Sequence, residues 1–491
     1  MSFIEWQKEG QRVTSLNHTN SIHNQAVNQV FNGTVNFPLS DQYAKFNSSE
    51  SSARNDDDIL RSLAFPEMFA RKDNMPQHYR STCEWILDLN EYKTWVKAPR
   101  GLLWIKGKPG AGKSTLMTFL YERLKNQYPK EQRGIVLEFF FYARGVDMQR
   151  TPLGMLRSLL NQLFRQDETI RFLVREPYNE KCAAFGNGKC NWEWQQRELE
   201  KLLQKAILLS AQQQVITIFV DALDAAGPQF ATEIATYLHL VSESLIAEGT
   251  SGKICISCRH YPVPTCRPGV EVCVENHNRN DIATYICGRL AQGYVMAAAG
   301  THGQWWYDLQ AEVIDRAKGV FQWAHLIVSL ILEKVADGRS PQDVRYCVQE
   351  VPDELGAVYA YILENVIKRE YYNRSFILFQ RLCLAERPLS VREMAYALAA
   401  RITAERPELR QSYDADDFKK TDEHLKQQIK ALSGGLVEVM ELQDNENREI
   451  IQVIHQSIIG FLRMQGLGLL ATLVGDKGDD LDAARHCTTH A

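Results

Sequence analysis

Blocks of apolar residues separated by amphipathic stretches run through the middle of the chain. Five blocks have the length of a buried strand: 101–107, 134–143, 215–220, 253–257 and 270–275. The stretches between them have helical periodicity, for example "STLMTFLYERLKNQ" and "PLGMLRSLLNQLF". Apolar strands joined by helical crossovers are typical of a parallel sheet with helices on both faces. The pattern therefore predicts an α/β domain with a parallel five-stranded sheet over residues 101–290.

The pattern becomes helical after residue 290, and we predict a helical domain over 291–378. Ser390 and Glu393 have the spacing of a capping box, which marks the start of a helix. Further on, "LVEVMELQ" and "REIIQVIH" alternate like the two strands of a hairpin, and the helical stretch "QSIIGFLRM" follows them. Helices followed by a two-stranded wing are typical of a winged-helix domain, which we place at 379–466.

Both ends of the chain differ from the middle. Residues 1–58 form a leader rich in Asn, Ser and Gln, in which asparagine recurs every four residues within "NSIHNQAVNQVFNGTVNF". On an extended strand this spacing puts the asparagines on one face and valine and phenylalanine on the other, which suits a stacked cross-β assembly. A disordered polar leader explains the same composition. We expect a helical linker over 59–100 and a flexible tail over 467–491.

Composition restricts the class of protein. The 491 residues allow about three domains. A net charge of −4 gives no reason to expect a nucleic-acid partner. Eleven cysteines without a regular framework suit a reducing compartment, and the charged start lacks a signal peptide. Because no apolar run approaches the roughly 20 residues of a membrane helix, we expect a cytoplasmic protein that does not span a membrane.

The segment "GKPGAGKST" carries the strongest chemical signal. It matches G-x-x-x-x-G-K-[ST] and lies between a predicted strand and a predicted helix, which is the setting of a phosphate-binding loop. Its glycines let successive N–H groups face one phosphate group, and the helix beginning near Lys113 adds its positive end. Lys113 is expected to reach the β- and γ-phosphates, and the Ser114 hydroxyl to bind Mg²⁺. The predicted nucleotide-binding residues of this segment are Gly107, Lys108, Pro109, Gly110, Ala111, Gly112, Lys113, Ser114 and Thr115.

Three further residues are candidates for catalysis. Asp221 follows the apolar run "VITIFV" and is expected to hold Mg²⁺ directly or through water. Asp224 either orients an attacking water or only begins a turn. Arg259, just after the strand candidate "KICIS", either contacts the γ-phosphate or is a surface arginine. Since no N-K-x-D guanine signature is present, we favour ATP over GTP.

Several stretches together resemble one protein family. They are "SLAFPEMFARKDN" and "STCEWIL" before the loop, "FVDALDAAG" and "ICISCRHYP" after it, and "KGVFQWAHLIV", "AERPLSVREMAYALA" and "VIHQSIIGFL" nearer the C-terminus. From about residue 60 to 465 the chain resembles the fungal NACHT-type STAND NTPases, relatives of animal and plant NOD-like immune receptors. Their P-loop portion is also described as nephrocystin-like.

This resemblance implies a switch that closes around ADP, opens on exchange for ATP, and then forms a homo-oligomer. It implies a role in non-self recognition, innate immunity or programmed cell death, as in heterokaryon incompatibility. It also implies that His455 contacts the β-phosphate and locks the closed form. Some family members carry N-terminal amyloid motifs that recruit a death-effector protein, which the leader of this chain would fit.

The chain departs from the family in three places. Ala225 follows Asp224 where the family commonly has glutamate, so at most slow ATP hydrolysis is expected. "KGVFQW" offers Gly319 and Phe321 but lacks the proline that touches adenine in NOD-like receptors. The repeats that usually follow are not found before the chain stops. We therefore predict an ATP/ADP-gated signalling switch; the alternative is a non-hydrolysing scaffold that signals through templated β-assembly of its leader.

Overall fold

The computed structural model describes residues 49–75, 77–127, 134–186, 192–260, 269–297, 304–385, 387–405, 422–441 and 449–475. The chain divides into two units, Met1–Asn55 and Asp56–Ala491. The asparagine-rich motif at 20–37 lies outside the described residues, so the cross-β prediction stays a prediction.

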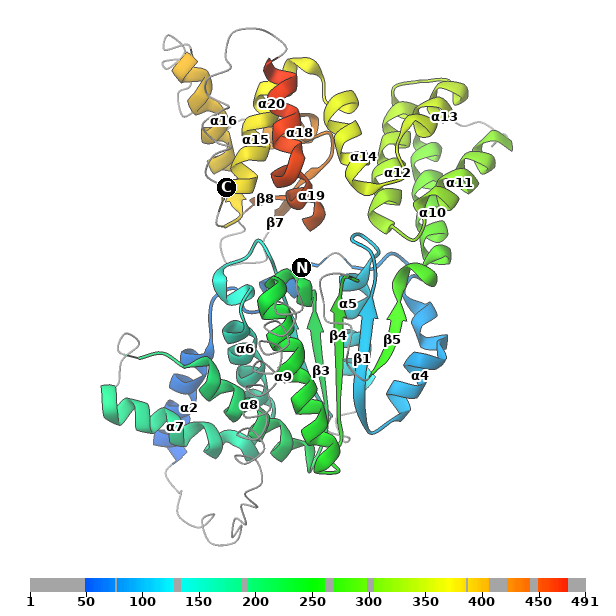
Figure 1. The fold of residues 1–491 in the computed structure, drawn as a ribbon. Helices are drawn as coiled ribbons and strands as arrows, with labels where there is room; N and C mark the ends of the chain where they lie inside the picture. Colours follow the sequence, from blue (N-terminus) through cyan, green and yellow to red (C-terminus); the bar gives the residue numbers. More distant parts are fainter. Residues whose placement is uncertain are drawn as a thin grey trace, which may run out of the picture. The chain divides into compact units, whose positions relative to one another are not determined.

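The five predicted strands form one parallel sheet (Figure 1). Its order is β2-β3-β4-β1-β5, and every pairing in it is parallel. The register places Lys106 opposite both Cys258 and Cys273, and Phe140 opposite Asp221. The carboxyl ends of the strands therefore meet at one edge, where the loops that follow them can share a ligand. The strands are β1 (Arg100–Lys106), β2 (Gly134–Phe140), β3 (Val215–Asp221), β4 (Gly252–Cys258) and β5 (Val270–Cys273).

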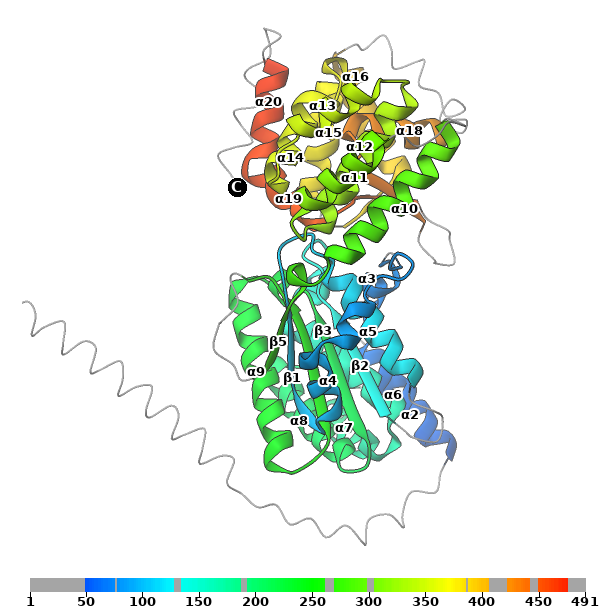
Figure 2. The same cartoon turned by 90° about the vertical axis from the view of Figure 1, so that its right-hand side faces the viewer.

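Helices cover both faces of this sheet, as the sequence predicts (Figure 1, Figure 2). Each face has its own hydrophobic cluster, and Leu102 and Leu103, adjacent on β1, belong to opposite clusters. One face carries α4 (Asn90–Lys97) and α5 (Lys113–Gln127). The other carries α6 (Pro152–Gln166), α8 (Gln196–Ala211) and α9 (Pro228–Ala247), and α7 (Arg171–Phe185) packs against α8.

The segment before the sheet is helical over more of its length than the sequence predicted. Helix α2 (Ser49–Leu63) begins inside the predicted leader, so the boundary at residue 58 is wrong. The helix forms because Ile59 and Leu63 are completely buried in the apolar cluster beside α6. The predicted helical linker contains α3 (Ala70–Asp73), a 3₁₀ turn at Glu84–Asp88, and α4.

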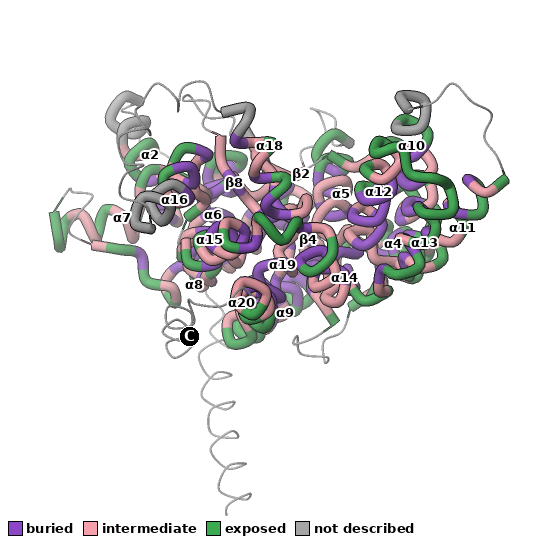
Figure 3. The backbone as a smooth tube through the Cα atoms, turned by 90° about the horizontal axis from the view of Figure 1, so that it is seen from above, coloured by how far each residue is buried: buried purple, intermediate pink, exposed green. Residues whose placement is uncertain are grey.

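The chain after the sheet is helical, and its helices share one hydrophobic cluster with the segment that follows residue 378. Buried Trp306, Trp323 and Tyr359 lie in this cluster together with Ile458, nearly a hundred residues on. Helix α12 is among the most buried (Figure 3). The predicted helical and winged-helix domains thus pack on a common core. The helices of the first part are α10 (Arg279–Ala297), α11 (Gln304–Ala317), α12 (Phe321–Ala336), α13 (Pro341–Glu350) and α14 (Leu355–Tyr361).

A small antiparallel sheet of order β6-β8-β7 follows. The predicted hairpin is present as β7 (Val437–Glu441) and β8 (Glu449–Val453), while β6 (Leu389–Ser390) was missed because two residues give no periodic signal. The predicted capping box is also present: the Ser390 N–H donates to Glu393 Oε2 at 2.8 Å, and the Glu393 N–H donates to Ser390 Oγ at 3.2 Å. The accompanying helices are α15 (Tyr372–Leu384), α16 (Val391–Glu405), α18 (Asp422–Ser433) and α19 (Gln456–Phe461).

The predicted flexible tail begins as a helix. Helix α20 (Leu467–Gly475) continues from α19 through a π-helical turn at Leu462–Gly466, because Leu470 is completely buried against the same core. Within the described residues, the helical stretch Gln456–Gly475 is long and apolar enough to cross a membrane, with a mean hydropathy of 1.6. The expectation that no stretch reaches this length therefore fails here. A core helix passes the same test, and Ile458 and Leu470 belong to the core.

Candidate nucleotide-binding site

The phosphate-binding loop has the setting that the sequence predicts, since β1 ends at Lys106 and α5 begins at Lys113. Gly110 and Gly112 have φ values of +77° and +95°, which favour glycine. A Cβ on Gly110 would lie 2.6 Å from the Cβ of Gln322, whereas a Cβ on Gly112 would meet nothing within 4 Å. Gly110 is therefore needed both for its backbone conformation and for the close approach of α12.

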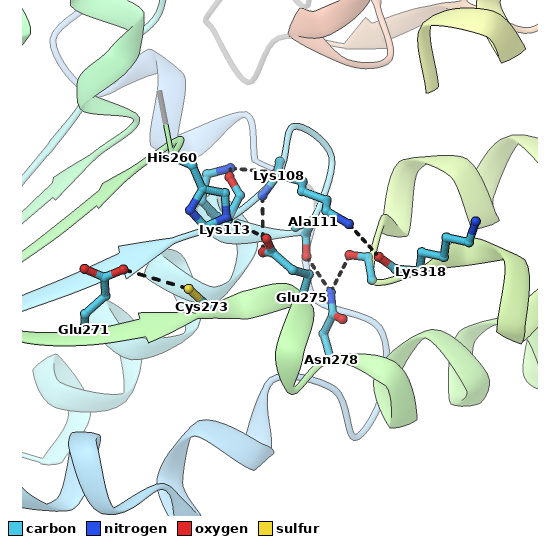
Figure 4. A network of polar contacts seen from close by, with 11 residues as sticks. Lys108, Ala111, Lys113, His260, Glu271, Cys273, Glu275, Asn278 and Lys318 are labelled. Carbon is cyan, nitrogen blue, oxygen red and sulfur yellow. Dashed lines mark hydrogen bonds and ion pairs between the residues drawn. The ribbon is translucent and has the colours of Figure 1, made fainter. Parts of the chain in front are cut away.

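A carboxylate after β5 holds the first part of the loop (Figure 4). Glu275 Oε2 accepts the Lys108 N–H at 3.2 Å, and Glu275 Oε1 lies 2.6 Å from Nε2 of His260. Burial would raise the pKa of Glu275, but its hydrogen bonds with His260 and backbone N–H groups outweigh burial, so the pKa is lowered. The carboxylate is thus kept ionised as an acceptor for the loop.

The second part of the loop is tied to α12. Asn278 Nδ2 donates to the carbonyl oxygens of Ala111 and Gly319, at 3.0 and 2.9 Å (Figure 4). The Gln322 N–H donates to the Gly110 carbonyl oxygen at 2.9 Å. The loop that would bind phosphate is therefore bonded directly to the "KGVFQW" segment. The sequence predicted a phosphate-binding loop but gave no indication of these contacts.

Lys113 lies beneath the loop. Its Nζ donates to the carbonyl oxygens of Gly107 and Lys108 at 2.8 and 2.9 Å. Burial lowers the pKa of Lys113; the carboxylate of Asp224 opposes this effect and Arg259 adds to it. A phosphate anion would favour the charged ammonium, so this environment fits a phosphate ligand.

Asp221 ends β3 and is completely buried. The Ser257 hydroxyl donates to Oδ1, while Oδ2 has no hydrogen-bond partner within the described part of the chain. Burial raises the pKa of Asp221, and the nearby hydroxyls of Ser257 and Ser114 partly offset this. A buried carboxylate oxygen without a donor, beside the serine hydroxyl of a P-loop, is a donor set that Mg²⁺ prefers. The side chains of Asp221 and Ser114 thus fit the predicted metal site.

The carboxylate of Asp224 is bonded to Arg259. Its Oδ1 accepts the Arg259 N–H at 3.0 Å, and its Oδ2 lies 2.8 Å from Arg259 Nε. Asp224 lies in the 3₁₀ turn Leu223–Ala226, and its carboxylate positions Arg259, a role that the sequence did not predict. The two alternatives for Arg259, a contact with the γ-phosphate or a surface arginine, stay predictions. Ala225 is buried in the apolar cluster beneath β3, so a glutamate at this position would have to leave that cluster to reach the site.

His455 caps the N-terminus of α19 through Nδ1, which accepts the Ser457 N–H at 3.2 Å. Because Nδ1 is the acceptor, the ring proton lies on Nε2, which is left as a donor. Ser457 Oγ lies 2.7 Å from both His455 Nδ1 and the Tyr359 hydroxyl, so α14 helps to fix the ring. Burial lowers the pKa of His455 to about 3. His455 is therefore neutral at physiological pH.

Positive charges surround His455. After burial, the causes of its low pKa are Lys113, Arg71, Arg259 and Arg144, in that order. The P-loop lysine and the histidine of the C-terminal half thus lie within electrostatic range of each other. Lys113, Arg259 and His455 were predicted from the sequence, whereas Arg71 and Arg144 were not. Arg71 lies in the stretch "SLAFPEMFARKDN" and Arg144 directly follows the second strand candidate, but neither belongs to a motif with a known spacing.

The comparisons with known proteins agree with this geometry. Residues 81–259 match the family described as Nephrocystin 3, N-terminal. The chain is also 24% identical over 326 residues to Vegetative incompatibility protein HET-E-1 of Podospora anserina. Together these matches support a NACHT/nephrocystin-like STAND NTPase domain. The match to HET-E-1 covers 63% of this chain and 22% of that protein.

Similar solved structures include an origin recognition complex from Drosophila bound to DNA. It has 13% identity, covers 90% of this chain and 99% of that chain, and has a TM-score of 0.34. Cdc6p from Pyrobaculum aerophilum has 12% identity, the match covers 84% of this chain and 99% of that chain, and the TM-score is 0.34. Scores this low do not establish a shared arrangement of the whole chain.

Proposed function

We propose that this NTPase domain gates a signalling switch, in which ADP holds a closed form and ATP favours an open form that assembles with further copies of the chain. ATP rather than GTP is proposed as the nucleotide, with Mg²⁺ held by Ser114 and Asp221. The observation that carries the proposal is that both halves of the chain contact the helices α12 and α14: the Gln322 N–H of α12 donates to the Gly110 carbonyl oxygen of the P-loop, and Tyr359 of α14 contacts Ser457, which holds His455. The charge of Lys113 is also among the causes that lower the pKa of His455. A nucleotide between them would stabilise the contact between those halves.

The roles of the site residues follow from their environments. Ser114 and Asp221 would hold Mg²⁺, which would supply positive charge to offset the charge that develops on the phosphates. Lys113 would bind the same phosphates as a point charge, and the N–H groups of the loop would orient them. His455 would donate Nε2–H to a phosphate oxygen. Because Asp224 is held by Arg259, no free carboxylate base is evident among these residues, which supports slow hydrolysis at most.

We also propose that the region at 379–466 is a winged-helix domain. The order helix α15, strand β6, helices α16 and α18, then strands β7 and β8 supports this proposal, since the last two strands form the wing. His455 lies directly after the wing, at the start of α19. The position of the histidine would then depend on the orientation of the whole domain.

The proposal is tested by the nucleotide that the purified full-length chain retains. We expect ADP to co-purify, to be released slowly, and to exchange for ATP with an increase in assembly size measured by light scattering. A Lys113→Ala variant should carry no nucleotide and should not change size. If the wild-type chain carries no nucleotide and binds neither ADP nor ATP, the proposal is wrong.

The asparagine periodicity of the leader favours a second candidate function, a scaffold that signals by templated β-assembly. Such a leader would recruit a death-effector protein without any need for hydrolysis. A synthetic peptide of residues 20–37 should then form thioflavin-positive fibrils within days. If it stays monomeric, this second function is excluded.

A further inference from the structure

Arg71 and Arg144 come from different segments and lie against the same aromatic ring. The guanidinium carbon of Arg71 is 5.0 Å from the centroid of the Tyr142 ring, and that of Arg144 is 5.2 Å from it. Tyr142 is buried and follows β2. Both arginines are thus held by cation–π contacts at the carboxyl edge of the sheet.

The two arginines lie near Asp221, the predicted Mg²⁺ ligand. The Phe141 N–H donates to the Asp221 carbonyl oxygen at 3.1 Å, so the residue before Tyr142 is bonded to the end of β3. If Ser114 and Asp221 held Mg²⁺ on the terminal phosphate of a nucleotide, groups on the Asp221 side of the loop would lie near that phosphate.

The surroundings fix Arg71 in place. Its neighbour Lys72 lies 3.6 Å from the buried carboxylate of Glu138 and 4.9 Å from the Tyr121 ring centroid. Further along, Gln149 Nε2 donates to the Glu67 carbonyl oxygen at 2.9 Å, and the Tyr142 N–H donates to the Gln149 carbonyl oxygen at 3.0 Å. The segment before the P-loop is therefore bonded to the loop after β2, which brings the two arginines together.

Among the residues that the structure describes, no carboxylate forms an ion pair with Arg71 or Arg144. Within the described residues, Arg144 Nε is buried without a hydrogen-bond partner. Glu438 on β7 lies within electrostatic range of Arg144, but Glu438 Oε1 accepts from Gln452 at 3.0 Å, and no ion pair with Arg144 is formed. Asp224, the carboxylate nearest to Arg259, is already paired. Two guanidinium groups lie over one ring, and Arg144 Nε has no acceptor. An anion bound there would accept this hydrogen bond and balance the positive charges.

We propose that Arg71 and Arg144 clamp the terminal phosphate of a bound nucleoside triphosphate, with Tyr142 as their shared platform. The clamp rests on the proposed nucleotide switch and names the residues by which the chain distinguishes ATP from ADP. It consists of residues outside the P-loop and outside the wing. A diphosphate lacks the group that the clamp would bind, so ATP would be favoured by the pair and ADP would not.

The clamp is tested by measuring ATP and ADP affinities in Mg²⁺ by calorimetry, for Arg71→Gln, Arg144→Gln and the control Arg150→Gln. Arg150 is exposed, lies in the same segment as Arg144, and pairs with Asp147. Each clamp variant should weaken ATP binding by about 10- to 100-fold and ADP binding by less than about 3-fold. Arg150→Gln should change neither.

A stability measurement separates a clamp from a structural role. Without nucleotide, Arg144→Gln should unfold at the same temperature as wild type or higher, because it removes a buried, unpaired charge. Tyr142→Phe keeps the aromatic platform and should keep the preference for ATP, whereas Tyr142→Leu should lose it. If the clamp variants lose affinity for ATP and ADP equally, or lose none, the proposed clamp is wrong. If the wild-type protein binds neither nucleotide, both the switch and the clamp are wrong.

Discussion

The two sides of the phosphate site differ in how they are built. One side is the P-loop, in which nine consecutive residues, 107–115, run from the end of β1 into the first turn of α5 and supply the backbone donors, Lys113 and Ser114. The other side is assembled from Arg71, Arg144 and His455, which are separated by up to 384 residues (455 − 71). The first side would contact phosphate groups common to ADP and ATP. Discrimination between nucleotides would come from the second side, because its three residues meet only through the packing of distant segments.

The largest expected effect comes from removing the charge of the P-loop side. Lys113→Ala should weaken both ADP and ATP binding by at least about 100-fold, which corresponds to about 2.7 kcal/mol. Calorimetric titration measures it, and Lys93→Ala, on an exposed lysine of α4, is the control. Retention of ADP affinity in the Lys113 variant would show that the remote side binds the nucleotide without the loop.

The contact between the loop and α12 is broken by adding one methyl group. Gly110→Ala should lower the free energy of unfolding by about 2–3 kcal/mol. The new Cβ clashes with Gln322, and the backbone at residue 110 has a positive φ that alanine disfavours. Gly112→Ala shares the positive φ without the clash and should cost about 1 kcal/mol. Urea denaturation without nucleotide measures both. Equal losses would mean that α12 does not pack on the loop in solution.

The buried carboxylate of Glu138, which pairs with Lys72 next to Arg71, should make the stability of the protein depend on pH. Burial raises the pKa of Glu138 to about 7, and the positive charge of Lys72 only partly opposes this. The unfolded chain loses this proton near pH 4.5, so the folded state binds more protons between pH 4.5 and 7 and stability falls as pH rises through that window. Glu138→Gln removes this penalty.

At pH 8 we therefore expect Glu138→Gln to unfold with a free energy about 2 kcal/mol higher than wild type. Below pH 4.5 the two proteins should be alike. Denaturation at several pH values measures the difference, and Glu122→Gln, on an exposed glutamate of α5, is the control. A pH profile of Glu138→Gln that parallels wild type would contradict a raised pKa.

The smallest expected effect on nucleotide affinity comes from His455, on the second side of the site. His455→Ala removes one hydrogen-bond donor and should weaken ADP binding by about 3- to 10-fold. Tyr359→Phe removes only the far end of the hydrogen-bond chain through Ser457 and should cost about 2-fold. Since the pKa of His455 is about 3, the loss should be the same at pH 6 and pH 8. A loss present only at pH 6 would indicate an imidazolium contact instead.

Periodicity was enough for most of the fold. The five strands and the hairpin appear within a few residues of their predicted positions, because each buries a continuous or alternating set of apolar side chains. Two boundaries failed for one reason. The polar residues 49–58 and the apolar residues 467–475 each belong to a helix that Leu63 or Leu470 anchors in a core built from other parts of the chain.

The sequence by itself determined that this chain has a phosphate-binding loop, since the donors of that loop are neighbours along the backbone and their geometry is local. It also determined the sheet that presents the loop. Only the tertiary structure brought Arg71 and Arg144 onto one tyrosine ring and placed His455 within range of Lys113. Those contacts join residues far apart in the chain, and electrostatic range is set by distance in space, which no spacing along the sequence encodes.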